Sequence, residues 1–490
     1  MPLRAFSREQ TWLLPPTLDE LVPPDHPARF VAAVVDALDR QAWASLDLAL
    51  EGDAQGAPAY HPRVLLSVWL YGFMTGVRST RKLEAACREQ LPYLWLTGWQ
   101  HPDHNTLWRF YQAHRQQMRQ LFKRTVRTAV RLGLVDLAVQ AVDGTKVVAN
   151  AAKDRTFDAK GLAKLLARAE AAIADLEAQN EGGDDPSPPR LPEGLTEVKA
   201  LQAQVQVALA QVQAEEGPER VNLTDGDAGL MKGRVGLVAG YNAQAMVSPL
   251  ETGTAGRSGL FLTAAEVTTD PDDHGQLVPM LEAAEQNTGQ RVPLSLADGG
   301  YHSGPNLAAC AQREQRVLMP EAQEQALEDP YHKEHFRYDA AEDRYTCPQG
   351  QTLTFRGVKE RKNRPVVRVY RAGPGVCRAC PAFGHCTKDR RQGRALEVGP
   401  EEQLLREHRA LMQTAEAKAA YGQRKELPEP AFGILKEQQG ARRFLLRGLE
   451  NVKAEWSLLG TAFNLRTLYR VWEGWTGSRR QALVGALGST

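Results

Sequence analysis

Two short apolar runs, each ending in Asp-Gly, constrain the fold of this chain more than any other feature. The first run, from Leu137 to Val142, leads directly into Asp143, and the run VPLSLA leads into Asp298. Apolar, β-rich runs of this length predict buried strands, here with a carboxylate at the C-terminal end of each. A single Asp-Gly pair after a strand is more often a turn than part of an active site. The interpretation therefore depends on a third acidic position.

A charged stretch near the carboxyl end of the chain, YGQRKELPEPAFGILK, supplies that position. If Pro430 opens a helix, Glu429 lies at its N-terminal edge, and Lys436 falls about two turns further along. The alternative is the start of an amphipathic helix whose charges are solvated. With Asp143 and Asp298, Glu429 completes a set of three carboxylates, and such oxygen ligands suit a pair of hard divalent cations. We therefore predict an α/β fold that brings these three acids together.

Several further motifs carry a resemblance to a known family. They are AVDGTKVVANA, GYNAQ, ADGGYH, RRFLLRGLENVKAEW and FNLRTLY, with LLSVWLYGFMTGVRSTRKLE and PDHNTLWRF in the amino-terminal part. With these motifs the chain resembles bacterial insertion-sequence transposases of the DDE type, which have a ribonuclease-H-like catalytic domain. The family signature places three residues between its Arg and its Glu, whereas Arg424 and Glu429 enclose four. Glu426 is therefore the alternative third acid, although the gap of six residues before Lys436 fits only Glu429.

The resemblance implies both an activity and roles for individual residues. Asp143, Asp298 and Glu429 would bind two Mg²⁺ ions, or Mn²⁺, for DNA cleavage at the element ends and strand transfer into target DNA. One metal would activate water or a DNA 3′-hydroxyl, and the other would stabilise the leaving oxygen. The residues expected to contact the phosphate backbone or a displaced base are Tyr421, Arg424 and Lys436. The alternatives are a structure-specific ribonuclease-H-like nuclease and a domesticated, non-catalytic DNA-binding protein.

The order of patterns along the chain predicts how the fold is divided. We expect a ribonuclease-H-like mixed sheet flanked by helices, preceded by a helical domain and interrupted by a helical hairpin and a small zinc-ribbon-like segment. The expected parts are a helical DNA-binding domain (1–135), the first part of the catalytic core (136–324) with a hairpin insertion at about 153–230, a cysteine-rich insertion (325–400), the C-terminal helices of the core (401–475) and a flexible tail (476–490).

One segment of the amino-terminal domain carries positive charge alone. Between Asn105 and Arg131 there is no Asp or Glu. A solvated helix face normally mixes charges of both signs, so a stripe of one sign favours contacts with phosphates. The residues that we expect to bind DNA are Arg109, Arg115, Arg119 and Lys123.

Four of the six cysteines gather late in the chain. Cys377 and Cys380 have zinc-knuckle spacing, and Cys347 and Cys386 complete four sulfur ligands for one structural Zn²⁺. His385 is an alternative ligand, whereas the remaining two cysteines lie in helical runs and are expected to serve packing.

Net charge and hydropathy bear on whether the chain binds nucleic acid or a membrane. The net charge of +1 means that a surface for nucleic acid must come from local segregation of charge. The absence of a long apolar run predicts no membrane contact and a cytoplasmic protein. The resemblance implies a bacterial protein associated with the nucleoid. The partners that the resemblance implies are double-stranded DNA, as terminal inverted repeats and target, and a second copy of the chain in a homodimer on DNA.

Overall fold

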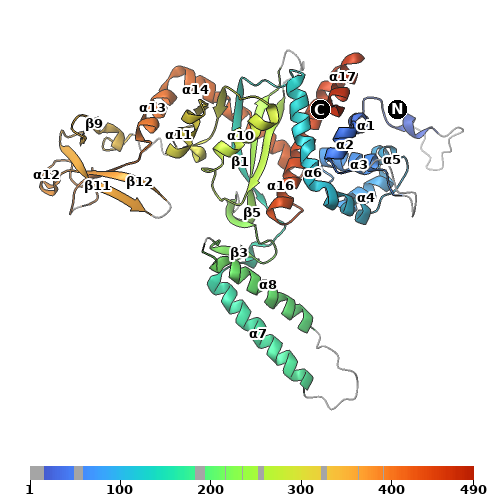
Figure 1. Cartoon of the computed structure of the whole chain (residues 1–490), viewed down its shortest axis with the longest axis horizontal. Coiled ribbons are helices and arrows are strands. Elements are labelled where there is room, and N and C mark those ends of the chain that lie inside the picture. Colours follow the sequence, from blue (N-terminus) through green and yellow to red (C-terminus); the bar gives the residue numbers. More distant parts are fainter. Residues whose placement is uncertain are drawn as a thin grey trace, which may run out of the picture.

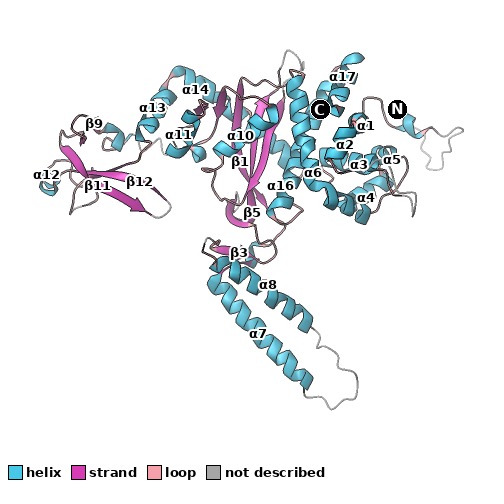
Figure 2. Ribbon diagram, viewed as in Figure 1, coloured by secondary structure: helices cyan, strands magenta, loops and turns pink. Residues whose placement is uncertain are grey.

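A central mixed sheet with three attached parts forms the architecture (Figure 1). The computed structural model describes residues 16–48, 59–181, 194–215, 217–233, 236–251, 259–321, 328–361, 364–389 and 391–489. Figure 2 shows the amino-terminal helices on one side of the sheet, a small strand-rich part on the other side and a helical hairpin that projects from one end. The mixed α/β fold with a helical amino-terminal region agrees with the prediction.

The amino-terminal part is entirely helical over its described residues. Its helices begin at polar caps: the side chains of His26, Asp39, His61 and Asp103 each accept a hydrogen bond from the first turn. The elements are η1 (Leu18–Leu21), α1 (Pro27–Ala37), α2 (Arg40–Ser45), α3 (Pro62–Thr75), α4 (Thr80–Glu89), α5 (Leu91–Leu96) and α6 (His104–Arg131).

The central sheet has the strand order β4-β5-β1-β7-β8, and β6 pairs with β5. Strand β5 runs antiparallel to β1, β4 and β6, whereas β1 and β7, and β7 and β8, are parallel. Parallel neighbours require crossover connections, which here contain helices. The strands are β1 (Val139–Val148), β4 (Gly229–Gly233), β5 (Gly236–Pro249), β6 (Leu260–Thr268), β7 (Leu294–Leu296) and β8 (Arg316–Leu318).

Helices cover both faces of this sheet. On β1, Ala141 joins one buried cluster and its neighbour Val142 joins another, because successive side chains point to opposite faces. The first face packs on α16 (Leu449–Gly474), whose Asn464 makes two hydrogen bonds of 2.9 Å with the backbone of Leu262. The elements that complete this region are α10 (Leu277–Thr288), η3 (Gly299–Tyr301), α11 (Gly304–Gln312), α13 (Glu402–Gln413), α14 (Ala415–Gly422), η6 (Gln423–Glu426), α15 (Pro428–Gly433) and the π-helical turn η7 (Ile434–Gln438).

The predicted helical hairpin is present between the first two long strands. Its two helices pack on each other through Leu162 and Val205, which are fully buried. These apolar residues give the hairpin a small core of its own, and Figure 1 shows its two helices side by side. Its elements are η2 (Lys153–Arg155), β2 (Thr156–Asp158), α7 (Ala159–Glu181), α8 (Leu195–Gln213) and β3 (Arg220–Asn222).

The cysteine-rich insertion forms a separate five-stranded antiparallel sheet in the order β13-β12-β11-β10-β9. Phe336, Tyr345, Leu353 and Tyr370 are buried in a core of its own. Its elements are η5 (Lys333–His335), β9 (Arg337–Asp339), β10 (Arg344–Thr346), β11 (Thr352–Arg361), β12 (Arg364–Arg371), α12 (Pro374–Arg378) and β13 (Ala395–Val398).

The prediction of a flexible tail at 476–490 is wrong for the described residues. The segment forms helix α17 (Ser478–Gly488), which packs against α1 and α6. Leu483 and Leu487 lie four residues apart on one helical face, and both are buried. The backbone N–H of Asp39 donates a 3.0 Å hydrogen bond to the carbonyl of Gly488. None of the helices in the described ranges is long and apolar enough to cross a membrane.

Candidate active site

Asp143 lies in the middle of a strand and not at its end. Strand β1 continues to Val148, and Asp143 is paired with Ala245 of β5. The prediction that Asp-Gly ends this strand is therefore wrong. Gly144 serves close packing, because a Cβ atom at this position would collide with the side chains of Gln244 and Asp273. The side chain of Asp143 is only 15% exposed.

Asp298 follows the short strand β7, as predicted. It is the N-cap of η3, and its Oδ1 accepts a 2.8 Å hydrogen bond from the backbone N–H of Gly300. Since β7 runs parallel to β1, the end of β7 lies beside the centre of the longer strand. This arrangement carries the carboxylate of Asp298 toward that of Asp143.

Glu429 lies in the first turn of α15, which begins at Pro428 and not at Pro430. Proline suits this first position because its missing N–H would have no partner within the helix. The side chain of Glu429 is 56% exposed, compared with 37% for that of Asp298. The three acids thus range from buried to open.

Arg424 joins the three carboxylates. Its Nη2 lies 3.0 Å from Oδ2 of Asp143 and 3.7 Å from Oδ2 of Asp298. Its Nη1 lies 3.9 Å from Oε1 of Glu429. The guanidinium is 10% exposed, so the structure places one nearly buried cation among three acids that are distant in sequence. The alternative acid, Glu426, is exposed, and among the described residues the ion pairs of Arg424 reach Glu429 instead.

Burial dominates the electrostatics of Asp143 and raises the pKa of its carboxyl group to about 6. Arg424 opposes this shift, whereas the nearby charges of Asp298 and Asp273 add to it. One guanidinium therefore compensates the negative charge only in part. Because part of the negative charge of these carboxylates is not neutralised by Arg424, the site is suited to a cation bound by oxygen ligands.

Lys436 approaches the same strand from η7. Its Nζ donates a hydrogen bond to Oγ1 of Thr145, two residues beyond Asp143. Burial lowers the pKa of Lys436, and the charge of Arg442 acts in the same direction. Tyr421, the first residue of the signature, is partly buried against the main core.

Asp273 is a neighbour of the acids to which the sequence analysis gave no role. Its Oδ1 accepts hydrogen bonds of 2.7 Å from Asn242 and 2.8 Å from Gln244, and it lies 3.5 Å from Nζ of Lys146. The hydroxyl of Tyr301 donates to Oε1 of Gln244. The signal in the sequence was the polar segment PDDHG before α10, which marked a helix start but no contact with Asp143.

Within the described ranges, no group of three or more His, Cys, Asp or Glu side chains is arranged to hold a metal ion. At the three acids, the guanidinium of Arg424 lies within ion-pair distance of each carboxylate. The donor set itself, three carboxylates of which one is buried, matches the oxygen ligands that Mg²⁺ and Mn²⁺ accept.

The basic stripe on α6 is partly used inside the protein. Nε of Arg115 donates a 2.7 Å hydrogen bond to Asn451, and Arg119 forms a 3.4 Å ion pair with Glu266. Arg109 is exposed and Lys123 is partly exposed. The sequence predicted DNA binding for all four residues. In the structure, Arg115 and Arg119 make contacts within the protein, whereas Arg109 and Lys123 lie toward the surface.

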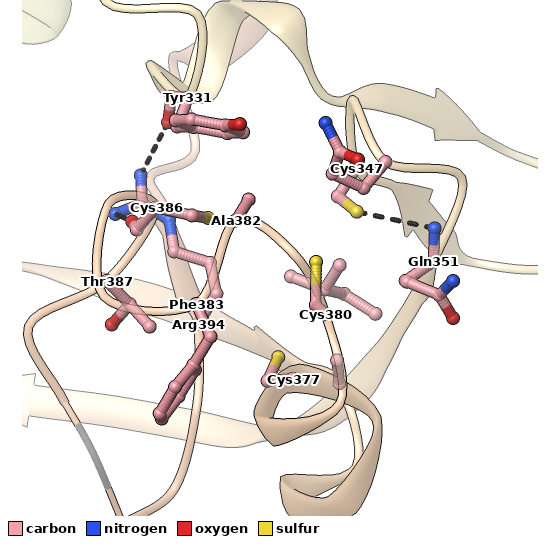
Figure 3. A pocket seen from close by; sticks show the side chains of 13 residues that line it. Tyr331, Cys347, Gln351, Cys377, Cys380, Ala382, Phe383, Cys386, Thr387 and Arg394 are labelled. Atoms are coloured by element: carbon pink, nitrogen blue, oxygen red, sulfur yellow. Dashed lines mark hydrogen bonds between the residues drawn. The ribbon is translucent and has the colours of Figure 1, made fainter.

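The four late cysteines line one small cavity of about 30 Å³ (Figure 3). The backbone N–H of Gln351 donates to Sγ of Cys347 at 3.3 Å, within a turn closed by Gly350 at a φ of +75°. Burial raises the pKa of the Cys386 thiol, and Cys347, Cys377 and Cys380 add to the shift. The thiols are thus neighbours, although they do not form a ligating group as they stand. Cys87 and Cys310 are buried in helices.

Comparison with family models gives two matches. A model described as a transposase DDE domain matches residues 346–469, and a model described as a transposase domain (DUF772) matches residues 16–113. The first range includes Arg424, Glu429 and Lys436, whereas Asp143 and Asp298 lie outside both ranges. No curated protein matches the chain.

Proposed function

We propose that this chain, which the two matches identify as an insertion-sequence transposase of the DDE type, cleaves DNA at the element ends and transfers the strand into target DNA. The observation that carries the proposal is the convergence of Asp143, Asp298 and Glu429 on Arg424. Three carboxylates repel one another unless cations neutralise them. A fold that gathers them is therefore suited to divalent metals.

The three acids are the proposed ligands of two Mg²⁺ ions, or Mn²⁺. When bound, such a pair supplies neutralisation of charge on the attacking and leaving oxygens of an in-line phosphoryl displacement. Asp143 would supply a ligand from strand β1, and Glu429 would supply one from the solvent-exposed side of the site. Arg424 lies within ion-pair distance of all three carboxylates, and its guanidinium would suit a phosphate oxygen of DNA once metal ions were bound to the acids. Lys436 and Tyr421 complete the proposed contacts with the DNA backbone or a displaced base.

The strand order supports a ribonuclease-H-like layout for the catalytic part. Three strands follow one another as an antiparallel set, β1, β5 and β6, and two shorter strands, β7 and β8, extend the sheet in parallel from β1. Asp143 lies on β1, and Asp298 follows the adjacent strand β7. We propose that 136–324 and 401–475 together form this catalytic core.

The outer parts have proposed roles in binding. Residues 1–135 bind the element ends, with Arg109 and Lys123 of α6 on the surface and Arg115 and Arg119 nearer the core. The hairpin and the cysteine-rich insertion extend the surface available to DNA or to a second copy of the chain. We propose a homodimer on DNA, in the bacterial nucleoid.

The cysteine-rich insertion is the proposed site of one structural Zn²⁺. Four sulfur ligands match the tetrahedral preference of zinc, and the N–H···S contact at Cys347 is a stabilising neighbour for a thiolate. His385 does not line the small cavity at the four cysteines in the described structure.

The experiment that tests the proposal incubates the purified full chain with a DNA fragment that carries the inverted repeats flanking its gene, together with a supercoiled target. We expect Mg²⁺-dependent cuts at the repeat ends and joined products in the target. Cuts without joined products would favour the structure-specific nuclease. Binding without cuts in either Mg²⁺ or Mn²⁺ would favour the domesticated DNA-binding protein.

A further inference from the structure

An aromatic pocket lies where the amino-terminal helices meet the loop before α16. It has a volume of about 230 Å³, whereas about 10–15 Å³ of such space already holds one water. The pocket is formed by α3, the start of α4, α6 and the loop segment that contains Leu445. None of the three acids or Arg424 lines it. It is therefore separate from the candidate active site.

Flat aromatic surfaces make up much of its wall. Trp69 and Tyr111 are stacked with their ring centroids 4.5 Å apart. Trp108 and Leu445 also line the pocket, and each is 39% exposed. Large apolar side chains that stay open to solvent around a hollow are typical of a site for a ligand with an apolar face. A planar ring fits such walls because it can stack on an indole.

Polar groups suited to an anion lie at the same pocket. Ser79 and Thr80 begin α4, and the side chain of Ser79 makes no capping hydrogen bond within the described structure. The first N–H groups of a helix point outward and favour negative charge. Tyr111 is 2% exposed, and its Oη has no hydrogen-bond partner in the described part of the chain. A buried hydroxyl without a partner is costly, so it independently indicates a missing ligand atom.

The charges around the pocket also favour an anion. Arg81 and Lys82 follow Thr80 on α4 and are exposed, as is Arg443 two residues before Leu445. The one carboxylate in the wall, Glu455, is already compensated. It accepts hydrogen bonds of 2.8 Å from Arg78 and of 3.0 Å from the backbone N–H groups of Leu445 and Leu446.

We propose that this pocket binds one unpaired nucleotide of the DNA, with its base against Trp108 and its phosphate at the amino end of α4 beside Tyr111. The inference rests on the proposed function for its choice of DNA as the ligand. Stacking on an aromatic side chain is tolerant of base identity, so the pocket would accept any base that leaves the duplex. It would hold an unpaired end while the acids, which lie outside the pocket, act on the backbone.

The test compares two DNA probes on the full chain without added Mg²⁺ or Mn²⁺, where no cleavage is expected. One is a blunt duplex, and the other is the same duplex with a 5′-phosphorylated overhang of four thymidines. Fluorescence anisotropy measures both dissociation constants. We expect tighter binding of the overhang, and we expect Trp108→Ala to reduce this preference by about 10-fold, as loss of one base–aromatic stack predicts. Tyr111→Phe should reduce the difference between phosphorylated and unphosphorylated overhangs.

Trp99→Ala is the matched control, since Trp99 is an exposed tryptophan of the same domain that does not line the pocket. Leu445→Ser is a second variant at an exposed position, in case Trp108→Ala lowers the melting temperature. Equal affinity of the unaltered chain for both probes would overturn the proposal. Equal behaviour of Trp108→Ala, Leu445→Ser and Trp99→Ala would also overturn it.

Failure of this inference is distinguishable from failure of the proposed function. A chain that prefers the overhang but never cuts DNA in Mg²⁺ would support the pocket and contradict the transposase chemistry. A chain that cuts only with its three acids intact but binds both probes equally would support the chemistry and contradict the pocket.

Discussion

This molecule has two clusters of side chains of the kinds that bind metals, and the two differ in what lies at their centre. The carboxylates of Asp143, Asp298 and Glu429 surround an internal cation, the guanidinium of Arg424. The four late cysteines surround a small cavity, and the side chains that line it include thiols and apolar groups. Both clusters lack the arrangement of a metal site within the described residues. They differ in what holds them together.

The difference follows from the charge of the ligands. Carboxylates are ionised near neutral pH, so a cluster of them needs a positive charge even when the protein is alone. In the cysteine cluster, burial raises the pKa of the Cys386 thiol, so this side chain stays neutral and needs no counter-ion. The acid cluster should therefore keep its shape without metal, whereas the cysteine cluster should depend on metal for its order.

The largest expected effect concerns chemistry at the acid cluster. Asp143→Asn and Asp298→Asn keep the size of each side chain but remove a ligand charge, so each should lower Mg²⁺-dependent cleavage by about 1,000-fold or more. A gel-based cleavage assay measures this, and filter binding of the same DNA should change little. The control is Asp136→Asn, at a position before β1 in the described structure. Cleavage by both site variants at the rate of the unaltered chain would break the comparison.

The next effect concerns the internal cation. Arg424→Gln leaves a buried carboxylate without its partner, which should cost about 3 kcal/mol of unfolding free energy in EDTA. Mg²⁺ should restore much of the loss, because it can replace the missing charge. Urea denaturation with and without Mg²⁺ measures both quantities. Lys425→Gln, at the exposed neighbouring position, is the control and should have little effect. If Arg424→Gln has the unfolding free energy of the unaltered chain and Mg²⁺ does not change it, Arg424 is not a counter-ion of the acids.

The cysteine cluster should respond in the opposite sense to metal removal. Elemental analysis should find about one zinc per chain, by the four-ligand rule. Chelation or Cys380→Ser should make the amides of β9 to β13 exchange faster with solvent, while the central sheet keeps its protection. Cys310→Ala, in α11, is the control that should leave the insertion unchanged. Zinc-free protein with unaltered exchange in the insertion would contradict this contrast.

The last expected effect is a dependence of stability on pH. Burial raises the pKa of Asp143 to about 6 from an ordinary value of 3.8, so the folded chain holds this proton more tightly than the unfolded chain does. The stability contributed by this group is full below about pH 4 and is lost as the pH rises through 6. Asp143→Asn should therefore gain up to about 3 kcal/mol relative to the unaltered chain at pH 8 in EDTA, and little at pH 4. Parallel stability curves for the two proteins would contradict the assignment.

Patterns in the sequence predicted much of the fold because they report local structure. The apolar runs before Asp143 and Asp298 predicted buried strands, and the Ala-rich and Leu-rich segments predicted the hairpin of α7 and α8. The tail was predicted to be flexible because the sequence does not show that α17, with Leu483 and Leu487, packs against α1. Gly144 likewise suggested a turn, although its role is to admit the side chain of Asp273.

The candidate site was predictable as a set of residues but not as an arrangement. Spacing favoured Glu429 over Glu426, and the ion pair with Arg424 agrees with that choice. Spacing gave no sign that Arg424 would face the acids, because that depends on how η6 packs against β1. Asp273 was missed for the same reason, since its contacts with Asn242 and Gln244 cross from one element to another.

The most direct test of the central claim compares Glu429→Gln with Glu426→Gln in the Mg²⁺-dependent cleavage assay. These variants make the same chemical change at two exposed glutamates that lie three residues apart, of which only Glu429 forms an ion pair with Arg424 in the described structure. We expect Glu429→Gln to lose cleavage and keep DNA binding, and Glu426→Gln to cleave like the unaltered chain. Full cleavage by Glu429→Gln would contradict the claim that Asp143, Asp298 and Glu429 form one catalytic metal site.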